Sequence, residues 1–218
     1  MRKLLLLTIG LTSIAIASQA QISKGTVLLG GNISGSTNKE TSSGSSNEYK
    51  NRALHLSPSI GFATSNNKVW GFNASYGSSR SKFEDITSSE YNRYGGGIFY
   101  RRYATLGKGF FLFGEANAGY AYSKQKVFTG PIGQLETRTV RTDMANLSVH
   151  PGIAYAVHKN FHLEVAINNI ANLGYSHQKI TTIGNGFGTS TTNKGFSFDS
   201  NISNNNPFSI GFRFALGK

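Results

Sequence analysis

The sequence predicts an all-β protein, an eight-stranded antiparallel up-and-down transmembrane β-barrel. Three observations predict this fold: an apolar period of two in eight segments, short turns that alternate with long polar connections, and charges opposite aromatic side chains. The third is clearest in residues 94–122, where Arg101 and Glu115 share one face with glycines while aromatic and aliphatic residues occupy the other. A soluble sheet would pack aliphatic residues on its inner face. The pattern therefore predicts a sheet that is apolar outside and polar inside.

The N-terminus predicts an exported protein. Two basic residues precede an apolar run at residues 4–17, and a small-x-small cleavage site follows at residues 18–20. The run is shorter than the ~20 residues that a spanning helix needs. We expect residues 1–20 to be a cleaved signal peptide and residues 21–218 to form one outer-membrane barrel domain. The chain has no cysteine, which excludes a disulfide scaffold and thiol chemistry.

Eight segments place apolar side chains at alternate positions, the period of a strand with one apolar face. The predicted strands cover residues 26–34, 52–63, 70–77, 94–103, 110–122, 143–157, 162–168 and 208–216. Their apolar faces carry, in order, Val27, Leu29 and Ile33; Leu54, Leu56, Ile60 and Phe62; Trp70, Phe72, Ala74 and Tyr76; Tyr94, Ile98 and Tyr100; Phe110, Leu112, Tyr120 and Tyr122; Leu147, Val149, Ile153 and Tyr155; Leu163, Val165 and Ile167; and Phe208, Ile210, Phe212, Phe214 and Leu216.

The connections between these strands are of two kinds, as in an up-and-down membrane barrel. Short turns are expected at residues 65–68, 104–109 and 158–160, and long polar loops at residues 35–51, 84–89, 124–142 and 176–206. In the last of these, Phe196 and Phe198 are candidates for the extension of a strand. Pro58 lies inside the second strand and lacks the N–H that a ladder needs, so a local irregularity is expected there.

Five blocks of the chain carry a family resemblance through their order and spacing: residues 98–103, 106–108, 111–122, 151–155 and 172–175. Together they resemble the outer-membrane β-barrel domain family of Gram-negative bacteria, in the broad OmpA/OmpX-like group. The resemblance implies an eight-stranded barrel in the outer membrane, inserted by the outer-membrane assembly machinery, with no shared enzymatic activity. The chain departs from the family at its end, because it runs past Phe214 to Lys218 instead of ending on an aromatic residue.

The charge of the chain points to membrane lipids as partners. The formal net charge is +12, and removal of the two basic residues of the signal peptide leaves 20 basic against 10 acidic residues, or +10. Six basic residues lie near the short turns and the termini: Lys24, Lys68, Arg102, Lys108, Lys159 and Lys218. We expect most of the basic excess at this periplasmic rim, where each contributes about 1 kcal/mol of attraction to anionic headgroups. No patch combines basic and aromatic residues on one polar surface, so nucleic acid is not an expected partner.

Five charged residues on the polar face of the strands predict a charge network in the lumen: Arg93, Arg101, Glu115, Glu164 and Arg213. A charge that faces lipid at the midplane costs about 2–4 kcal/mol, so these side chains should point inward. We expect Glu164 to pair with Arg213, and Glu115 to meet Arg101 or Arg93. The alternative is that each charge reaches water at a mouth of the barrel.

The apolar face supplies aromatic residues that we expect to face lipid or to form girdles at the two membrane interfaces. These residues are Trp70, Phe72, Tyr76, Tyr94, Tyr100, Tyr120, Tyr122, Tyr155, Phe208, Phe212 and Phe214.

The architecture favours a structural or surface-interaction role through the long extracellular loops, for which the sequence specifies no ligand, in a protein that we expect to be a monomer. An eight-stranded barrel is just wide enough for side chains to fill. Lumen glycines would leave room for the first alternative, a narrow porin-like channel: Gly71, Gly77, Gly95, Gly97, Gly119, Gly152 and Gly211. The second alternative is a soluble exported β-barrel carrier, whose aromatic face would line an interior.

A lipid-modifying barrel enzyme is the remaining alternative, and we do not expect one. Its candidate groups pair a histidine with a hydroxyl or carboxylate: His150 with Ser148, and His177 with Asp199. Neither pair forms a recognisable nucleophile motif. His158 and His162 straddle a turn and are the only histidines with a spacing to consider for a metal. We therefore expect no catalytic residues, no cofactor and no metal site.

Overall fold

The computed structural model describes residues 22–41, 48–83, 86–129, 136–167, 170–184, 187–200 and 208–217, and the predicted signal peptide lies outside these ranges. Ten β-strands follow one another along the described chain. They are β1 (Val27–Thr41), β2 (Glu48–Ser65), β3 (Lys68–Phe83), β4 (Ile86–Gly107), β5 (Phe110–Thr129), β6 (Glu136–His158), β7 (Phe161–Ile167), β8 (Ala171–Gly184), β9 (Phe187–Asp199) and β10 (Phe208–Leu216). Within the same ranges, no helix is long and apolar enough to cross a membrane.

Eight of these strands close into an antiparallel barrel. Neighbouring strands pair in chain order from β1 to β7, and β10 then pairs with both β7 and β1. The closing ladder places Val27 opposite Leu216 and Gly31 opposite Phe212. The predicted fold class, an all-β eight-stranded antiparallel up-and-down barrel, is confirmed.

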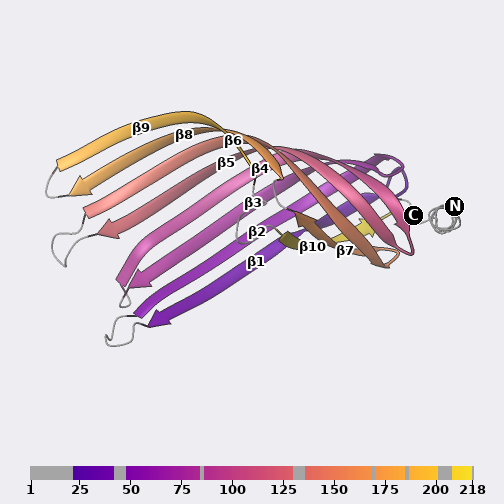
Figure 1. The fold of residues 1–218 in the computed structure, drawn as a ribbon, viewed down its shortest axis with the longest axis horizontal. Helices are drawn as coiled ribbons and strands as arrows, with labels where there is room; N and C mark the ends of the chain where they lie inside the picture. The colour runs from indigo at the N-terminus through magenta and orange to yellow at the C-terminus, as the bar shows by residue number, and fades with distance from the viewer. Residues whose placement is uncertain are drawn as a thin grey trace, which may run out of the picture.

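The other half of the sheet is open within the described residues. From Thr137 to Val149, β6 pairs with β8, whereas only its part after Val149 pairs with β7; β8 pairs in turn with β9. β9 has no second neighbour there, and β1 beyond Gly31 pairs only with β2. Figure 1 shows β9 and β1 as the opposite edges of a curved sheet that extends away from the barrel. Membrane barrels keep their short turns on the periplasmic side, an arrangement that would place this extended sheet at the cell exterior.

Most of the polar stretches that we expected to be loops are strands, which corrects the predicted boundaries. Residues 35–51, 124–142 and 176–206 fall largely within the β1–β2, β5–β6 and β8–β9 hairpins, and β4 already begins at Ile86. A strand that stands above the membrane has no apolar face, so hydropathy does not reveal its period of two. The expected strand extension at residues 196–198 is present in β9.

Pro58 interrupts one ladder of β2 without shifting it. β2 pairs with β1 through this residue, which lies opposite Gly31. Pairing with β3 stops after Leu56 and resumes at Ser59 in the same register. The irregularity expected at Pro58 is therefore a gap in the pairing with one neighbour.

The β4–β5 turn uses backbone conformations that favour glycine. Gly107, Lys108 and Gly109 have φ angles of 96°, 50° and 82°, where a side chain costs about 1–2 kcal/mol. Gly109→Ala should therefore destabilise the barrel by about 1 kcal/mol, measured as a lower urea midpoint of unfolding in detergent. Lys108→Gly is the matched opposite change and should keep or raise the midpoint. A higher midpoint for Gly109→Ala would contradict the strain assigned to this turn.

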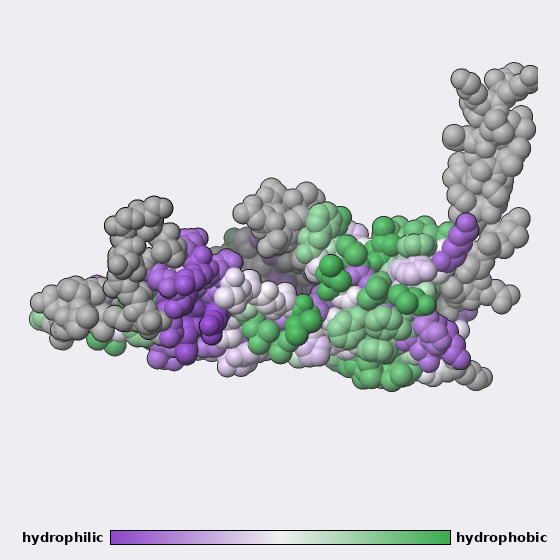
Figure 2. All heavy atoms as spheres, turned by 90° about the horizontal axis from the view of Figure 1, so that it is seen from below, coloured by the Kyte–Doolittle hydropathy of each residue, from purple (hydrophilic) through white to green (hydrophobic). Residues whose placement is uncertain are grey.

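Large apolar side chains cover the outside of the barrel. Trp70, Phe72, Ile98 and Leu147 are each about half exposed, with exposed fractions of 50%, 58%, 48% and 56%. Figure 2 shows hydrophobic residues gathered on the half with the short turns and hydrophilic residues on the extended half. A contiguous apolar surface of this kind matches the lipid-facing band of a membrane barrel.

The inside of the barrel next to the short turns is an apolar core. Leu28, Val69, Phe99 and Phe111 are almost completely buried there. The Phe99 ring occupies the space above Gly71, since a Cβ atom at Gly71 would lie 2.4 Å from Phe99 Cζ. The prediction of a polar interior is therefore wrong at this end, because the glycines of the inner face accommodate aromatic rings from the same face.

Candidate functional site

Four of the five predicted lumen charges meet in one buried layer above the apolar core. Arg101 on β4 donates from Nη1 to Glu164 Oε1 and Oε2 on β7, at 2.7 and 2.8 Å, and from Nε to Glu115 Oε2 on β5, at 2.7 Å. Arg213 on β10 donates from Nε to both Glu164 oxygens at 3.0 Å. The four side chains are 5%, 7%, 13% and 6% exposed in the order Arg101, Glu164, Glu115, Arg213. The layer joins β4 to β7 and β10 across the barrel.

Strand register explains which charges meet. Arg101 and Glu115 are direct cross-strand partners. Arg213 lies opposite His162, so it reaches Glu164 diagonally. Arg93 lies eight positions before Arg101 on β4, opposite Gly77 and Ser123, which is roughly 26 Å along the strand. Arg93 therefore lines the lumen far above this layer, and Glu115 meets Arg101.

Aromatic rings hold the two guanidinium groups in place, and sequence reasoning missed them. The Arg101 guanidinium lies 4.0 Å from the centre of the Phe113 ring, and the Arg213 guanidinium lies 5.4 Å from that of Phe99. Tyr103 Oη accepts a hydrogen bond of 3.0 Å from Arg101 Nη1. Such cation–π contacts are stronger when the cation is desolvated. The sequence did contain a signal for these rings, because Phe99, Tyr103 and Phe113 fall at the same alternate positions of their strands as the inward charges.

A cavity of about 290 Å³ lies above the charge layer and is open on one side. Its lining is polar and includes His55, Asn73, Asn117 and Asn146 in addition to the charged residues. Beneath the layer, a Cβ atom at Gly152 would lie 2.4 Å from Phe113 Cζ. Gly71 and Gly152 thus do not provide the conduit that the channel hypothesis assigned to lumen glycines, since aromatic rings fill their space.

The remaining candidate groups are placed as follows. Ser148 Oγ and His150 Nε2 are 2.9 Å apart on the lumen face of β6. His177 and Asp199 lie on different faces of the β8–β9 hairpin. Asp199 pairs with Asn172, and Asn172 and His177 are five residues apart on β8, so their side chains point to opposite sides. Within the described ranges, no three His, Asp or Glu side chains gather as they would around a metal ion.

The predicted girdle aromatics lie at outward positions. The Trp70 ring packs against that of Tyr100, and the Tyr76 ring against that of Tyr94, with ring centres 4.9 and 5.4 Å apart. Tyr76, Tyr94 and Tyr122 form one row across β3, β4 and β5, which we call the upper tyrosine row. From Phe110 to Tyr120, ten residues of tilted strand span about 25 Å, the height of a lipid-facing band.

A cationic band lies on the outward face above the upper tyrosine row. Side chains that alternate in step with the outward aromatics, or that pair with them across strands, lie on the same face. Ten cations of the described strands meet this criterion: Lys39, Lys50, Arg52, Arg80, Lys82, Lys124, Lys126, Arg141, Lys179 and Lys194. Only Glu48, Glu90 and Asp143 oppose them there. Ten cations against three carboxylates make this face strongly positive, because other acidic residues of the extended sheet, such as Glu40 and Asp199, point inward. The basic excess expected at the periplasmic rim stays a prediction.

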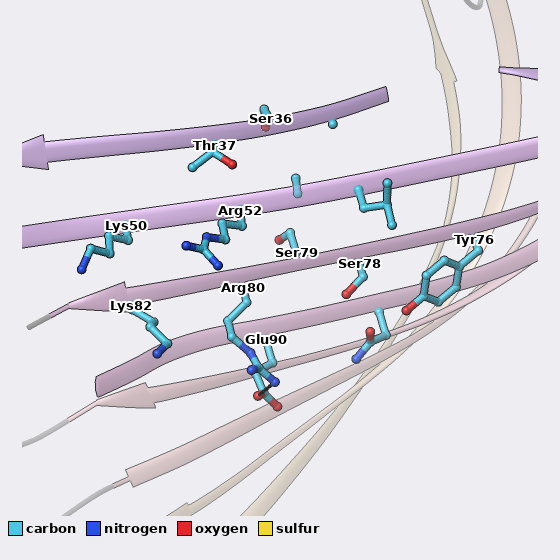
Figure 3. Close-up of a pocket in the computed structure, with 14 residues that line it drawn as sticks. Ser36, Thr37, Lys50, Arg52, Tyr76, Ser78, Ser79, Arg80, Lys82 and Glu90 are labelled. Carbon is cyan, nitrogen blue, oxygen red and sulfur yellow. Dashed lines mark hydrogen bonds and ion pairs between the residues drawn. The ribbon is translucent and has the colours of Figure 1, made fainter. Parts of the chain in front are cut away.

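The band contains a second candidate site, a groove of about 700 Å³ across β1 to β4 (Figure 3). Lys50, Arg52, Arg80 and Lys82 line it together with Glu90. Arg80 Nη2 lies 2.7 Å from Glu90 Oε1, and Figure 3 shows these two side chains side by side. Sequence reasoning missed the groove, because Lys50 lies in a predicted loop, Arg52 begins a predicted strand, and the other three residues lie outside both. Its signal was the repeated spacing of two between cations on two paired segments.

A ring of eight strands with an apolar exterior and buried charges inside is the architecture of bacterial outer-membrane barrels. The chain has the fold of an outer-membrane β-barrel. It is similar to the outer membrane protein OprG from Pseudomonas aeruginosa, at 13% identity and a TM-score of 0.49 over 90% of this chain and 98% of that chain. It is also similar to the translocator domain of the autotransporter NalP from Neisseria meningitidis, at 14% identity and a TM-score of 0.48.

The second match covers 90% of this chain and 63% of the NalP chain, so this barrel spans less than two thirds of that protein's length. No protein-family model matches the sequence. No curated protein matches it either.

Proposed function

We propose that the protein is a structural or surface-interaction protein of the outer membrane, anchored by its barrel and acting through the extended sheet. The observation that carries this proposal is the filled lumen. Arg101, Glu115, Glu164 and Arg213 cross the barrel as one layer above an apolar core. An eight-stranded barrel filled with side chains passes no large solute. The exposed hairpins are then the part of the protein available to a partner.

A narrow channel is the competing function, and the cavity of about 290 Å³ above the charge layer favours it. For ions to pass, the charge layer and the rings of Phe99 and Phe111 beneath it would have to move together. Both rings are at most 2% exposed. Packing of this kind resists movement because interiors are close to crystal density.

Planar-bilayer recordings distinguish the two functions. The wild-type protein should give no stable conductance steps, whereas Phe99→Ala/Phe111→Ala should give small steps because it opens the apolar core. Phe72→Ala removes the same ring from the lipid face and should stay silent. Heat-dependent gel mobility establishes that each variant is folded. Stable steps from the wild-type protein would overturn the proposal and establish the channel.

Hairpin deletion tests the surface-interaction role itself, and the strand register defines the cuts. Lys124 lies opposite Arg141, so residues 125–140 can be replaced by a two-residue turn without disturbing the ladder below. His177 and Lys194 allow the same for residues 178–193. We expect these deletions to impair binding or envelope integrity in cells while the barrel stays in the membrane. A phenotype confined to variants that disrupt the barrel would contradict the interaction role.

A further inference from the structure

The groove on β1 to β4 concentrates positive charge in pairs that the described carboxylates neutralise only in part. Arg52 lies directly opposite Arg80, and Lys50 lies directly opposite Lys82. Like charges at directly opposed positions destabilise a sheet. Two consecutive pairs of this kind, on one face, indicate that an anion outside the protein balances them.

The protein's own carboxylates balance only part of this charge. Glu48 is shared between Lys39 and Lys50, at 2.9 and 2.7 Å, and Glu90 is taken by Arg80. In the described part of the chain, Arg52 and Lys82 have no ion pair. Arg52 is exposed and Lys82 is half-buried, and both line the groove.

The groove is also amphipathic along the strand direction. Leu54 and Tyr76 line its membrane-side end; the Ser78 hydroxyl lies opposite Leu54, and the Thr37 hydroxyl lies opposite Arg52, at the level of the first cations. Tyr76 belongs to the upper tyrosine row, and Arg80 lies four residues beyond it on the same face. Four residues of tilted strand rise about 10 Å. The cations therefore lie at the height of lipid headgroups in the outer leaflet, with an apolar surface directly below them.

We propose that this groove is a binding site for the phosphate groups of an outer-leaflet glycolipid. Arg52 and Lys82 bind phosphate, with Arg80 and Lys50 adding charge; guanidinium groups suit phosphate because their donors match its oxygens. The hydroxyls of Thr37 and Ser78 contact sugar groups, and Leu54 with Tyr76 contacts the start of the acyl chains. This site rests on the proposed position in the outer membrane. Binding in micelles and location in the membrane are measured in separate experiments, so failure of one can be told apart from failure of the other.

Titration of the purified, folded protein in dodecyl maltoside micelles with bisphosphorylated lipid A tests the site, with binding followed by native mass spectrometry. Arg52→Gln/Lys82→Gln should weaken binding about 30-fold, because each basic residue near an anionic surface raises the affinity by a factor of about five. Lys124→Gln/Lys179→Gln is the matched control, since it removes two cations from the same band outside the groove. The control should change the affinity by less than about threefold.

Further ligands separate the lipid from other sources of phosphate. Dephosphorylated lipid A should bind weakly, and inorganic phosphate should not compete at concentrations comparable to the lipid. Wild-type binding should also weaken as salt is raised, which tests the charge without any variant. Equal loss in the groove variant and its control would overturn the site in favour of diffuse attraction. Equal binding of dephosphorylated lipid A, or inorganic phosphate bound as tightly as the lipid, would also overturn it.

Discussion

Glu164→Gln is expected to destabilise the barrel by about 3–5 kcal/mol, because it leaves two buried guanidinium groups without their shared carboxylate. Glu164 lies between Arg101 at 2.7 Å and Arg213 at 3.0 Å, and its side chain is 7% exposed. Glutamine keeps the shape of the side chain, so the loss of unfolding free energy reports the removed charge and not a change in packing. Urea unfolding in detergent, followed by the fluorescence of Trp70, the single tryptophan, gives the difference.

Two comparison variants decide whether burial causes the effect. Glu115→Gln should cost less, because Glu115 is 13% exposed and Arg101 keeps Glu164 as a partner. Glu90→Gln breaks the exposed pair with Arg80 and should cost less than about 1 kcal/mol. A wild-type urea midpoint for Glu164→Gln would contradict the charge layer. Equal losses for Glu164→Gln and Glu90→Gln would show that burial does not strengthen these pairs.

The closed part of the barrel was predictable from sequence because the membrane imposes a chemical contrast on it. Strands such as β3 and β10 alternate between lipid and lumen, so their apolar residues repeat with a period of two. The same contrast marked Arg101, Glu115, Glu164 and Arg213 as inward charges, because lipid exposure is too costly for them. The extended hairpins lack this contrast, and their polar composition indicated loops.

The outward groove could not be predicted from the spacing of its cations alone, for a different reason. Arg52 and Arg80 are 28 positions apart in the chain, and only the β2–β3 register places them opposite each other. Pairing register depends on turn geometry and on the pattern of the whole strand. Likewise, Phe99 and Phe113 occupy positions that the alternation predicts to face a polar lumen, and only the structure shows that glycines on neighbouring strands leave space for their rings. Both features arise between strands and not within one strand.

Phe99→Ala is expected to destabilise the barrel by about 3–5 kcal/mol, since it removes a ring that is 1% exposed and leaves a cavity in the core. The ring packs over Gly71 and under Arg213, whose guanidinium lies 5.4 Å from its centre. Phe72→Ala is the matched control, because it removes the same ring from a position that is 58% exposed on the lipid face. It leaves no internal cavity and should cost much less.

Gly71→Ala tests the same packing from the other side and should cost about 1–3 kcal/mol through overpacking. The added Cβ would lie 2.4 Å from Phe99 Cζ and 2.3 Å from the backbone oxygen of Ile60. Phe99→Ala relieves only the first contact, so Phe99→Ala/Gly71→Ala should cost less than the sum of the single variants but more than Phe99→Ala alone. Urea unfolding of all four proteins measures this coupling. Strict additivity would mean that the ring does not occupy the space above Gly71, and the filled lumen would lose its main support.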